Sequence, residues 1–495
     1  MSLSRRTFLQ TTAAGVAGLP FLPAVTATDA KLDPNLVRLD SGIEPLVRFL
    51  EDTPRDRLVE EVVGKIKKGL PYKDVLAALL LAGVRNVQPR PNVGFKFHAV
   101  LVVNSAHLAS LASPDHERWL PILWAVDNFK NSQAQTIKES GWRMKSVDEM
   151  KLPSARTARK EFVAAMDDWD EAKADAAVAA LARTAPANEM FDLFARYGCR
   201  DFRDIGHKAI FVANAFRTIG CIGWHHAEPV LRSLAYALLQ HEGTNPAKRD
   251  AAADVIGRHN ADRAKKLGEN WLTGRPHVPP TKILTELRSL SADNAAEMVL
   301  ATVGMGAAVQ TVWDGLFLFA AECLMRQPGI VALHTATSLN ALRYAFDTCS
   351  VEETRKVLLL QAASYMTLFR EAMKGRKDKT QDVQIDAVEP ASKPMGEADL
   401  FALVPKDRMA AARAALKTMQ TDSTAADRIS AAARKLVFFK GNDAHDYKFS
   451  AATIEDYRHV SPPWRNRVLA AAMFNFKGSG ENDSGVARRV KAALT

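Results

Sequence analysis

The sequence of 495 residues lacks the short motifs that mark several large enzyme classes. It has no Gly-x-Ser-x-Gly nucleophile elbow, no glycine-rich phosphate loop, no Gly-x-Gly-x-x-Gly after a strand and no Cys-x-x-Cys-His haem attachment site. These absences disfavour a serine hydrolase, a nucleotide-binding protein and a c-type cytochrome.

Cysteine is scarce, with Cys199, Cys221, Cys323 and Cys349 and no Cys-x-x-Cys pair. A thiolate metal cluster is therefore not expected. Cys199 and Cys221 are the nearest pair if the protein carries a disulfide, but buried free thiols are the expected state because most of these residues lie in apolar, helix-like runs.

The chain also lacks long apolar runs and clustered positive charge. No segment after residue 27 reaches the roughly 18 uninterrupted apolar residues of a membrane span, so no membrane span is expected there. The net charge is +10, but the basic residues are scattered and not interleaved with aromatic ones. Nucleic-acid binding is therefore not expected.

Signals for β-strands are almost absent, and helical periodicity extends over most of the chain. The predicted helices are 54–68, 72–86, 94–112, 116–135, 154–167, 169–183, 187–198, 203–219, 226–241, 247–264, 281–290, 292–306, 308–326, 331–348, 352–374, 406–419, 424–438, 443–458 and 462–475. They predict an all-α protein, an irregular array of stacked antiparallel helical pairs in a single large domain. A polar, proline-containing loop insertion is expected at 375–396.

The N-terminus carries the most specific motif. Paired arginines in Ser4-Arg5-Arg6-Thr7-Phe8-Leu9 precede a mildly apolar stretch and small residues near Ala27. This pattern predicts a twin-arginine signal peptide over 1–27, followed by one helical domain over 28–495. It implies recognition by the twin-arginine export machinery and a periplasmic or otherwise exported protein.

Three helical segments each place a histidine in an apolar or small-residue face. His98, His207 and His334 are followed six or seven residues later by Asn104, Asn214 and Asn340, respectively. At about 100° per residue, only Asn214 shares the face of its histidine, so we interpret the asparagines as packing or hydrogen-bonding residues. Several imidazoles that point into one helical core would make a metal site.

Two further segments add histidines. In Trp224-His225-His226, the face of His226 is apolar and that of His225 is charged, so His226 is the preferred ligand. His445 and Lys448 are one turn apart, and a buried lysine beside a metal can react with carbon dioxide to give a ligating carbamate. A single histidine on an apolar face is usually a hydrogen-bonded core residue, so both interpretations stay open. For His445 and Lys448 the alternative is a solvated helix N-terminus with Asp443 as its cap.

Buried carboxylates are costly unless they are paired or bound to a metal. Asp314 and Glu322 lie among apolar residues and are interpreted as acceptors that orient the ligand imidazoles, and Asp204 and His225 are given the same supporting role. The alternative for the three carboxylates is an ion pair with an arginine.

Four short segments resemble the questin oxidase-like family. They are Phe97-His98, Trp224-His225-His226 with the helix around Leu231-Arg232, Leu333-His334-Thr-Ala-Thr337, and Asp443-Ala-His445-Asp-Tyr-Lys448, within residues 90–475. The resemblance implies an all-helical oxygenase acting on aromatic polyketide rings. It further implies non-haem iron held by His98, His226, His334 and His445, with Lys448 carbamylated. His207 is an additional ligand candidate from the helix pattern.

The sequence therefore predicts an exported, metal-dependent oxidoreductase that uses dioxygen on an aromatic or polyketide-like small molecule. Iron is the expected metal, with zinc or another divalent ion as the alternative. Two other functions remain open: a non-catalytic helical-repeat binding or scaffold protein, and a zinc-dependent lyase or hydrolase built on the same histidines.

Overall fold

The computed structural model describes residues 33, 35–89, 97–376 and 380–495. Within these residues the regular structure is helical, and extended pairing is limited to the isolated bridges Leu36–Lys145 and Arg275–Ala307. The predicted all-α fold is confirmed. The predicted signal peptide at 1–27 lies outside the described residues.

Most helices begin and end within a few residues of the predicted bounds. The first half of the chain forms α2 (Glu44–Asp52), α3 (Arg55–Lys67), α4 (Tyr72–Asn86), α5 (His98–Leu111), α6 (Leu120–Glu139), α7 (Ala158–Asp167), α8 (Glu171–Thr184), α9 (Ala187–Gly198), α10 (His207–Ile222), α11 (Ala227–Leu238) and α12 (Ala252–Ala264). The second half forms α13 (Pro280–Leu287), α14 (Ala292–Gly304), α15 (Val309–Arg326), α16 (Ile330–Thr348), α17 (Glu352–Lys374), α18 (Glu397–Leu403), α19 (Arg408–Thr421), α20 (Ala425–Lys440), α21 (Ala444–His459), α22 (Pro462–Ala471) and α23 (Gly485–Leu494).

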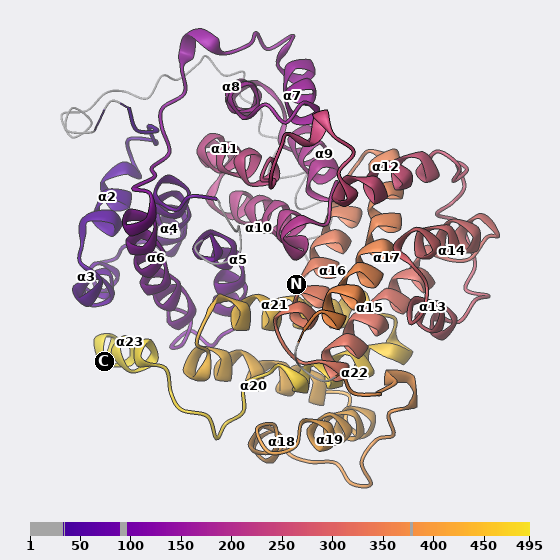
Figure 1. Ribbon diagram of the computed structural model, residues 1–495. Helices are drawn as coiled ribbons and strands as arrows, with labels where there is room; N and C mark the ends of the chain where they lie inside the picture. The colour runs from indigo at the N-terminus through magenta and orange to yellow at the C-terminus, as the bar shows by residue number, and fades with distance from the viewer. Residues whose placement is uncertain (1–32, 34, 90–96, 377–379) are drawn as a thin grey trace.

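Three helices were not predicted: α2, α18 and α23. They are short, with nine, seven and ten residues. Helices of this length are marginal in isolation and depend on tertiary packing. α23 illustrates this, because it packs against α3 and α6 at the opposite end of the sequence (Figure 1).

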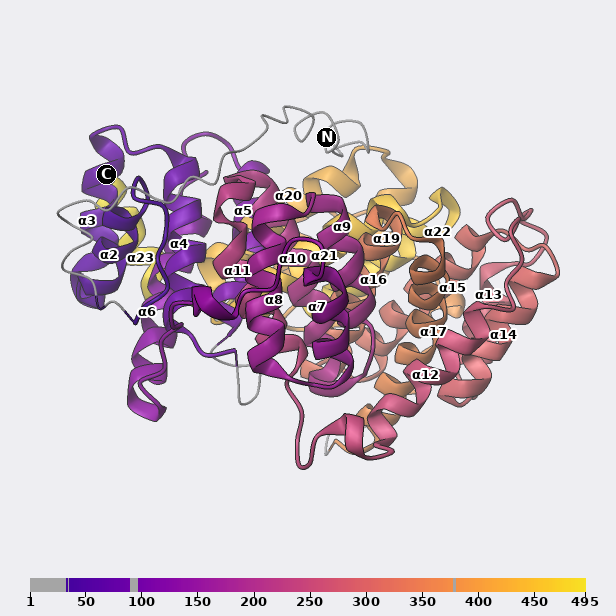
Figure 2. The ribbon, with the colours of Figure 1, turned by 90° about the horizontal axis from the view of Figure 1, so that it is seen from above.

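The helices pack as neighbouring pairs around the centre of the molecule (Figures 1 and 2). The long helices α15, α16 and α17 pack against one another, and α13 and α14 cover them from outside. The C-terminal helices α18 to α22 lie along one side, and α21 reaches inward from them to the middle.

Four helices from distant parts of the chain form a closed ring at this centre. α5 packs on α10, α10 on α16, α16 on α21, and α21 back on α5. α5 and α16 are buried at almost every position from His98 to Ser110 and from Val331 to Leu342. A helix that is apolar or small all round belongs in the interior, which explains why these segments form the core.

The predicted loop at 375–396 is non-helical from residue 380 onward, except for a 3-10 turn at Ile385–Ala387. It is anchored to the core. Ile385 is buried, its amide donates to Glu322, and its carbonyl accepts from Arg467. No helix of the described residues is long and apolar enough to cross a membrane.

Candidate metal centre

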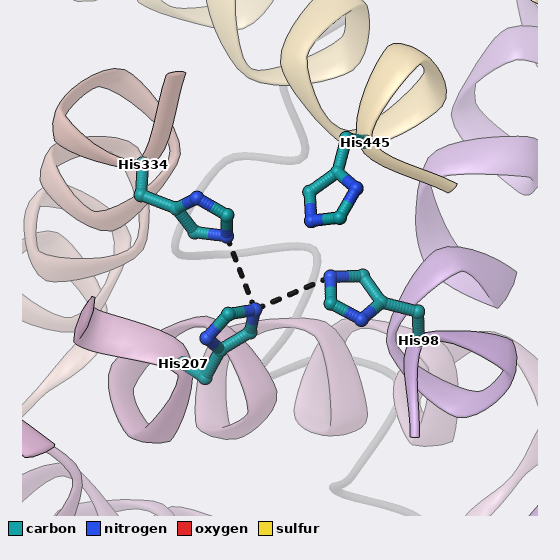
Figure 3. Close-up of side chains that lie close together, drawn as sticks. All are labelled: His98, His207, His334 and His445. Carbon is teal, nitrogen blue, oxygen red and sulfur yellow. Dashed lines mark hydrogen bonds between the residues drawn. The ribbon is translucent and has the colours of Figure 1, made fainter. Parts of the chain in front are cut away.

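Each helix of the central ring contributes one histidine from its N-terminal end. His98 and His207 are the first residues of α5 and α10, His445 is the second residue of α21, and His334 lies one turn into α16. The four side chains face one another in the middle of the ring (Figure 3). The structure thus brings together residues that are far apart in the sequence.

The ligand atoms of the four histidines lie within 4.8 Å of one another. His207 is central to the group, with its Nε2 3.2 Å from Nε2 of His98 and 3.1 Å from Nε2 of His334. The ring of His445 lies 4.2 Å from that of His98 and 5.2 Å from that of His334, between centroids. His334 is fully buried, and the side chain of His445 is 12% exposed.

The protonation of two imidazoles follows from their neighbours. Nδ1 of His207 lies 2.5 Å from the carbonyl oxygen of Asp204, and Nδ1 of His334 lies 2.6 Å from that of Ile330. A carbonyl oxygen only accepts hydrogen bonds, so each Nδ1 carries the proton and donates it. Both Nε2 atoms are then left with lone pairs directed at each other.

Two lone pairs 3.1 Å apart repel unless a cation lies beside both of them. Nitrogens bound to one metal at about 2.1 Å lie about 3.0 Å apart at a right angle and about 3.4 Å apart at the tetrahedral angle. The distances of 3.1 and 3.2 Å from His207 fall between these values. The four histidines could therefore hold a metal ion in a buried site.

Lys448 points into the same group. Its Nζ lies 2.8 Å from Nε2 of His98 and 3.5 Å from Nε2 of His207, and the residue is 2% exposed. No carboxylate of the described residues forms an ion pair with it. A buried lysine without an anion is costly, so its position needs an explanation in the chemistry of the site.

Burial dominates the electrostatics of the group. It lowers the pKa of His98, His207 and His334 well below the ordinary value, and the charge of Lys448 adds to this effect. Burial also lowers the pKa of Lys448 to about 7. The three imidazoles are consequently neutral at neutral pH, which is the form that binds metals.

The metal-free protein should lose stability as the pH falls below about 6.5. In the unfolded chain the histidines take up protons near that pH, whereas in the folded chain His98, His207 and His334 do so only at lower pH. The unfolded state then binds more protons, and each histidine lowers the free energy of unfolding by up to about 1.4 kcal/mol per pH unit. Urea unfolding of metal-free protein between pH 7.5 and 5 measures this slope, and a His207→Phe variant should have a smaller one. A slope that His207→Phe leaves unchanged would contradict the assignment.

A left-handed turn positions His207. Asp204, Ile205 and Gly206 have φ angles of 55°, 46° and 80°, and they turn the Asp204 carbonyl back toward the imidazole. Side chains rarely adopt this conformation, and a Cβ on Gly206 would overlap Oγ of Ser338 on α16. The turn therefore depends on glycine at 206.

Gly206→Ala should lower the free energy of unfolding by about 2 to 5 kcal/mol, the sum of left-handed strain and overpacking. Chemical denaturation measures the loss. Gly220→Ala is the matched control, because that glycine of α10 has open space around its Cβ position and helical φ. Equal stability of the two variants would show that the turn is not strained.

A relative with the same metal chemistry would need to carry the same four histidines. No family model, curated protein or solved structure matches this chain. The resemblance to the questin oxidase-like family remains a prediction from four short segments.

The prediction that His226 joins His98 and His334 is wrong. Trp224–His226 is a 3-10 turn and α11 begins only at Ala227. His226 therefore lies before the helix, and helical spacing does not tell which way its side chain points. Its ring instead packs on that of His225, 3.9 Å away between centroids. His225 likewise contacts none of the four clustered histidines.

The predicted carboxylate acceptors also differ from expectation. Glu322 forms ion pairs with Arg288 and Arg326, the alternative that the sequence left open. Asp314 accepts from the side-chain amide of Gln310 and from the backbone amide of residue 461. Both carboxylates are held by these other groups, and neither forms a hydrogen bond with a clustered histidine.

Asp204 does orient His207, but through its backbone carbonyl rather than its carboxylate. The oxygen Oδ2 of that carboxylate is buried without a hydrogen-bond partner, and burial raises the pKa of the group.

Asp443 supports His445 in a similar way. Its carboxylate caps α21 by accepting from the amide of His445 and lies 3.2 Å from Nδ1 of the same residue.

The four cysteines are free, with Cys199, Cys323 and Cys349 buried and Cys221 half-buried, as expected.

A cavity of about 710 Å³ lies between α9, α12 and α17, lined by Trp169, Tyr197 and Arg200 among others. None of the four clustered histidines lines it.

Proposed function

We propose that the protein is an exported, metal-dependent oxidoreductase that binds non-haem iron at His98, His207, His334 and His445. The observation that carries this proposal is the pair of lone pairs on His207 and His334, fixed by their carbonyl partners and facing each other at 3.1 Å. Imidazole suits iron, copper, nickel and zinc, so the donor set fits iron without requiring it.

Bound iron would supply the capacity to activate dioxygen for the oxidation of an aromatic or polyketide-like small molecule. The chain itself would keep the imidazoles neutral and preoriented and shield the centre with the apolar walls of α5 and α16. The substrate class rests on the resemblance to the questin oxidase-like family, and export rests on the paired arginines Arg5 and Arg6.

Lys448 would complete the site as a carbamate. In that reaction the neutral amine nitrogen bonds to the carbon of carbon dioxide, and one proton leaves to solvent. The product is an anionic oxygen ligand next to His98 and His207. Its support is geometric, since Nζ is buried against the two imidazoles and has no carboxylate partner among the described residues.

Metal analysis of the protein purified after export tests the proposal. About one iron per chain is expected, together with dioxygen consumption that depends on this iron and on an aromatic substrate. Less than about 0.2 metal per chain, unchanged by anaerobic iron loading, would favour the non-catalytic scaffold, because such sites bind with folding-scale energies. Stoichiometric zinc without dioxygen consumption would favour the lyase or hydrolase.

A further inference from the structure

The asparagines that follow three of the clustered histidines form a second polar layer inside the same helical ring. Nδ2 of Asn104 donates to Oδ1 of Asn214 at 3.4 Å, and Nδ2 of Asn214 donates to the carbonyl of Leu101 at 2.9 Å. Nδ2 of Asn340 donates to Glu455 and to Asp456. The asparagines are therefore hydrogen-bonding residues, as predicted, and all three line the same small cavity.

An ion pair closes the outer side of this layer. Nη2 of Arg217 on α10 lies 2.7 Å from Oε2 of Glu455 on α21, and Nη1 of Arg217 donates to Asn340 at 3.3 Å. The side chains of Arg217 and Glu455 are 11% and 32% exposed, whereas the three asparagines are buried. The layer thus extends from the surface toward the centre.

A narrow cavity follows the same direction. It is lined at its outer end by Arg217, Glu455 and the half-buried Ala451, and at its inner end by Lys448. None of the four histidines lines the cavity, but Lys448, which does, places its Nζ 2.8 Å from Nε2 of His98. Its water-accessible space is about 10 Å³, about enough for one water molecule.

We infer that this cavity is the passage by which water, protons and molecules of the size of dioxygen reach the histidine group, with the Arg217–Glu455 pair as its outer closure. The inference rests on the proposed function, because it assigns an access route to that metal site. The amides of the three asparagines offer donors and acceptors to a passing water without adding a charge. A space of about 10 Å³ is too small for an aromatic molecule, so such a substrate would have to reach the site by another route.

Azide is a suitable probe, since it is a narrow triatomic ligand whose binding changes the visible spectrum of protein-bound cobalt(II). The wild type and each variant are loaded with cobalt(II), their metal content is measured, and azide binding is followed by stopped flow. Ala451→Phe places a ring at the outer end of the cavity. Ala432→Phe, at a half-buried alanine of α20 outside the ring, is the matched control.

Ala451→Phe should slow azide association by about tenfold or more at unchanged metal content, because entry then requires a conformational change. Ala432→Phe should leave the rate unchanged. Equal rates in wild type and Ala451→Phe would overturn the passage and indicate entry beside His445, whose side chain is 12% exposed. A wild type that takes up no cobalt(II) or iron would overturn the metal site itself, a result distinct from the first.

If Ala451→Phe fails to fold, Arg217→Ala gives the opposite test. Removal of the guanidinium opens the outer end, so azide association should become faster than in the wild type. An unchanged rate in this variant would likewise contradict the passage.

Discussion

His207→Ala should abolish stable metal binding while the helical fold persists. His207 lies between His98 and His334, and its Nε2 is within 3.2 Å of Nε2 in both. Loss of this imidazole removes the ligand that lies nearest to both of the others. We expect the metal affinity to fall by about a hundredfold or more, since loss of a mere supporting partner already costs 10- to 100-fold.

His226→Ala is the matched control for this experiment. His226 is also a buried histidine whose pKa is lowered, to about 4, but it packs against His225 and not in the group. Its replacement should leave the metal content unchanged. Metal analysis and circular dichroism of both variants give the comparison, and metal loss in His226→Ala with retention in His207→Ala would reverse the assignment.

Lys448→Ala should weaken metal binding, because we propose that Lys448 is a carbamate ligand. The sign of the effect separates two states of the side chain. An ammonium 2.8 Å from His98 repels a cation, so its removal would strengthen metal binding, whereas removal of an anionic carbamate would weaken it. We expect weaker binding, by about tenfold or more, with the helical content preserved.

Lys130→Ala controls for the loss of a buried lysine, because Lys130 donates to the carbonyl of Glu51 and to Gln133 instead of to a histidine. Mass spectrometry under native conditions should detect one added carbon dioxide in the wild type and none in Lys448→Ala. Tighter metal binding by Lys448→Ala would show that the side chain is an ammonium.

The helical fold was largely predictable, because apolar periodicity in a chain poor in β signals leaves few alternatives. The inward direction of His98, His207 and His334 was predictable for the same reason. Their convergence was not, since the contact between Lys448 and His98 joins residues 350 positions apart. Periodicity defines the face of a helix but not which other helices that face meets.

His226 shows where the helical arithmetic fails. The rule of 100° per residue predicts its face only if the helix begins before it, but the backbone there is a 3-10 turn and α11 starts one residue later. Glu322 shows a second limit. Its place in an apolar helix correctly predicts that the buried carboxylate has a partner. Nothing in the local sequence shows whether that partner is a histidine or Arg288, which lies 34 residues away.

The positions of the histidines at the start of their helices have an electrostatic consequence. α5, α10 and α21 begin at or next to a clustered histidine, and α16 begins one turn before His334. The N-terminal end of a helix carries a partial positive charge of about half an elementary unit. A cation bound among neutral imidazoles would meet several such ends, so the centre as a whole should favour an additional negative ligand. Hydroxide, a carboxylate or the carbamate of Lys448 would each satisfy that demand, and a neutral ligand of similar size should bind more weakly.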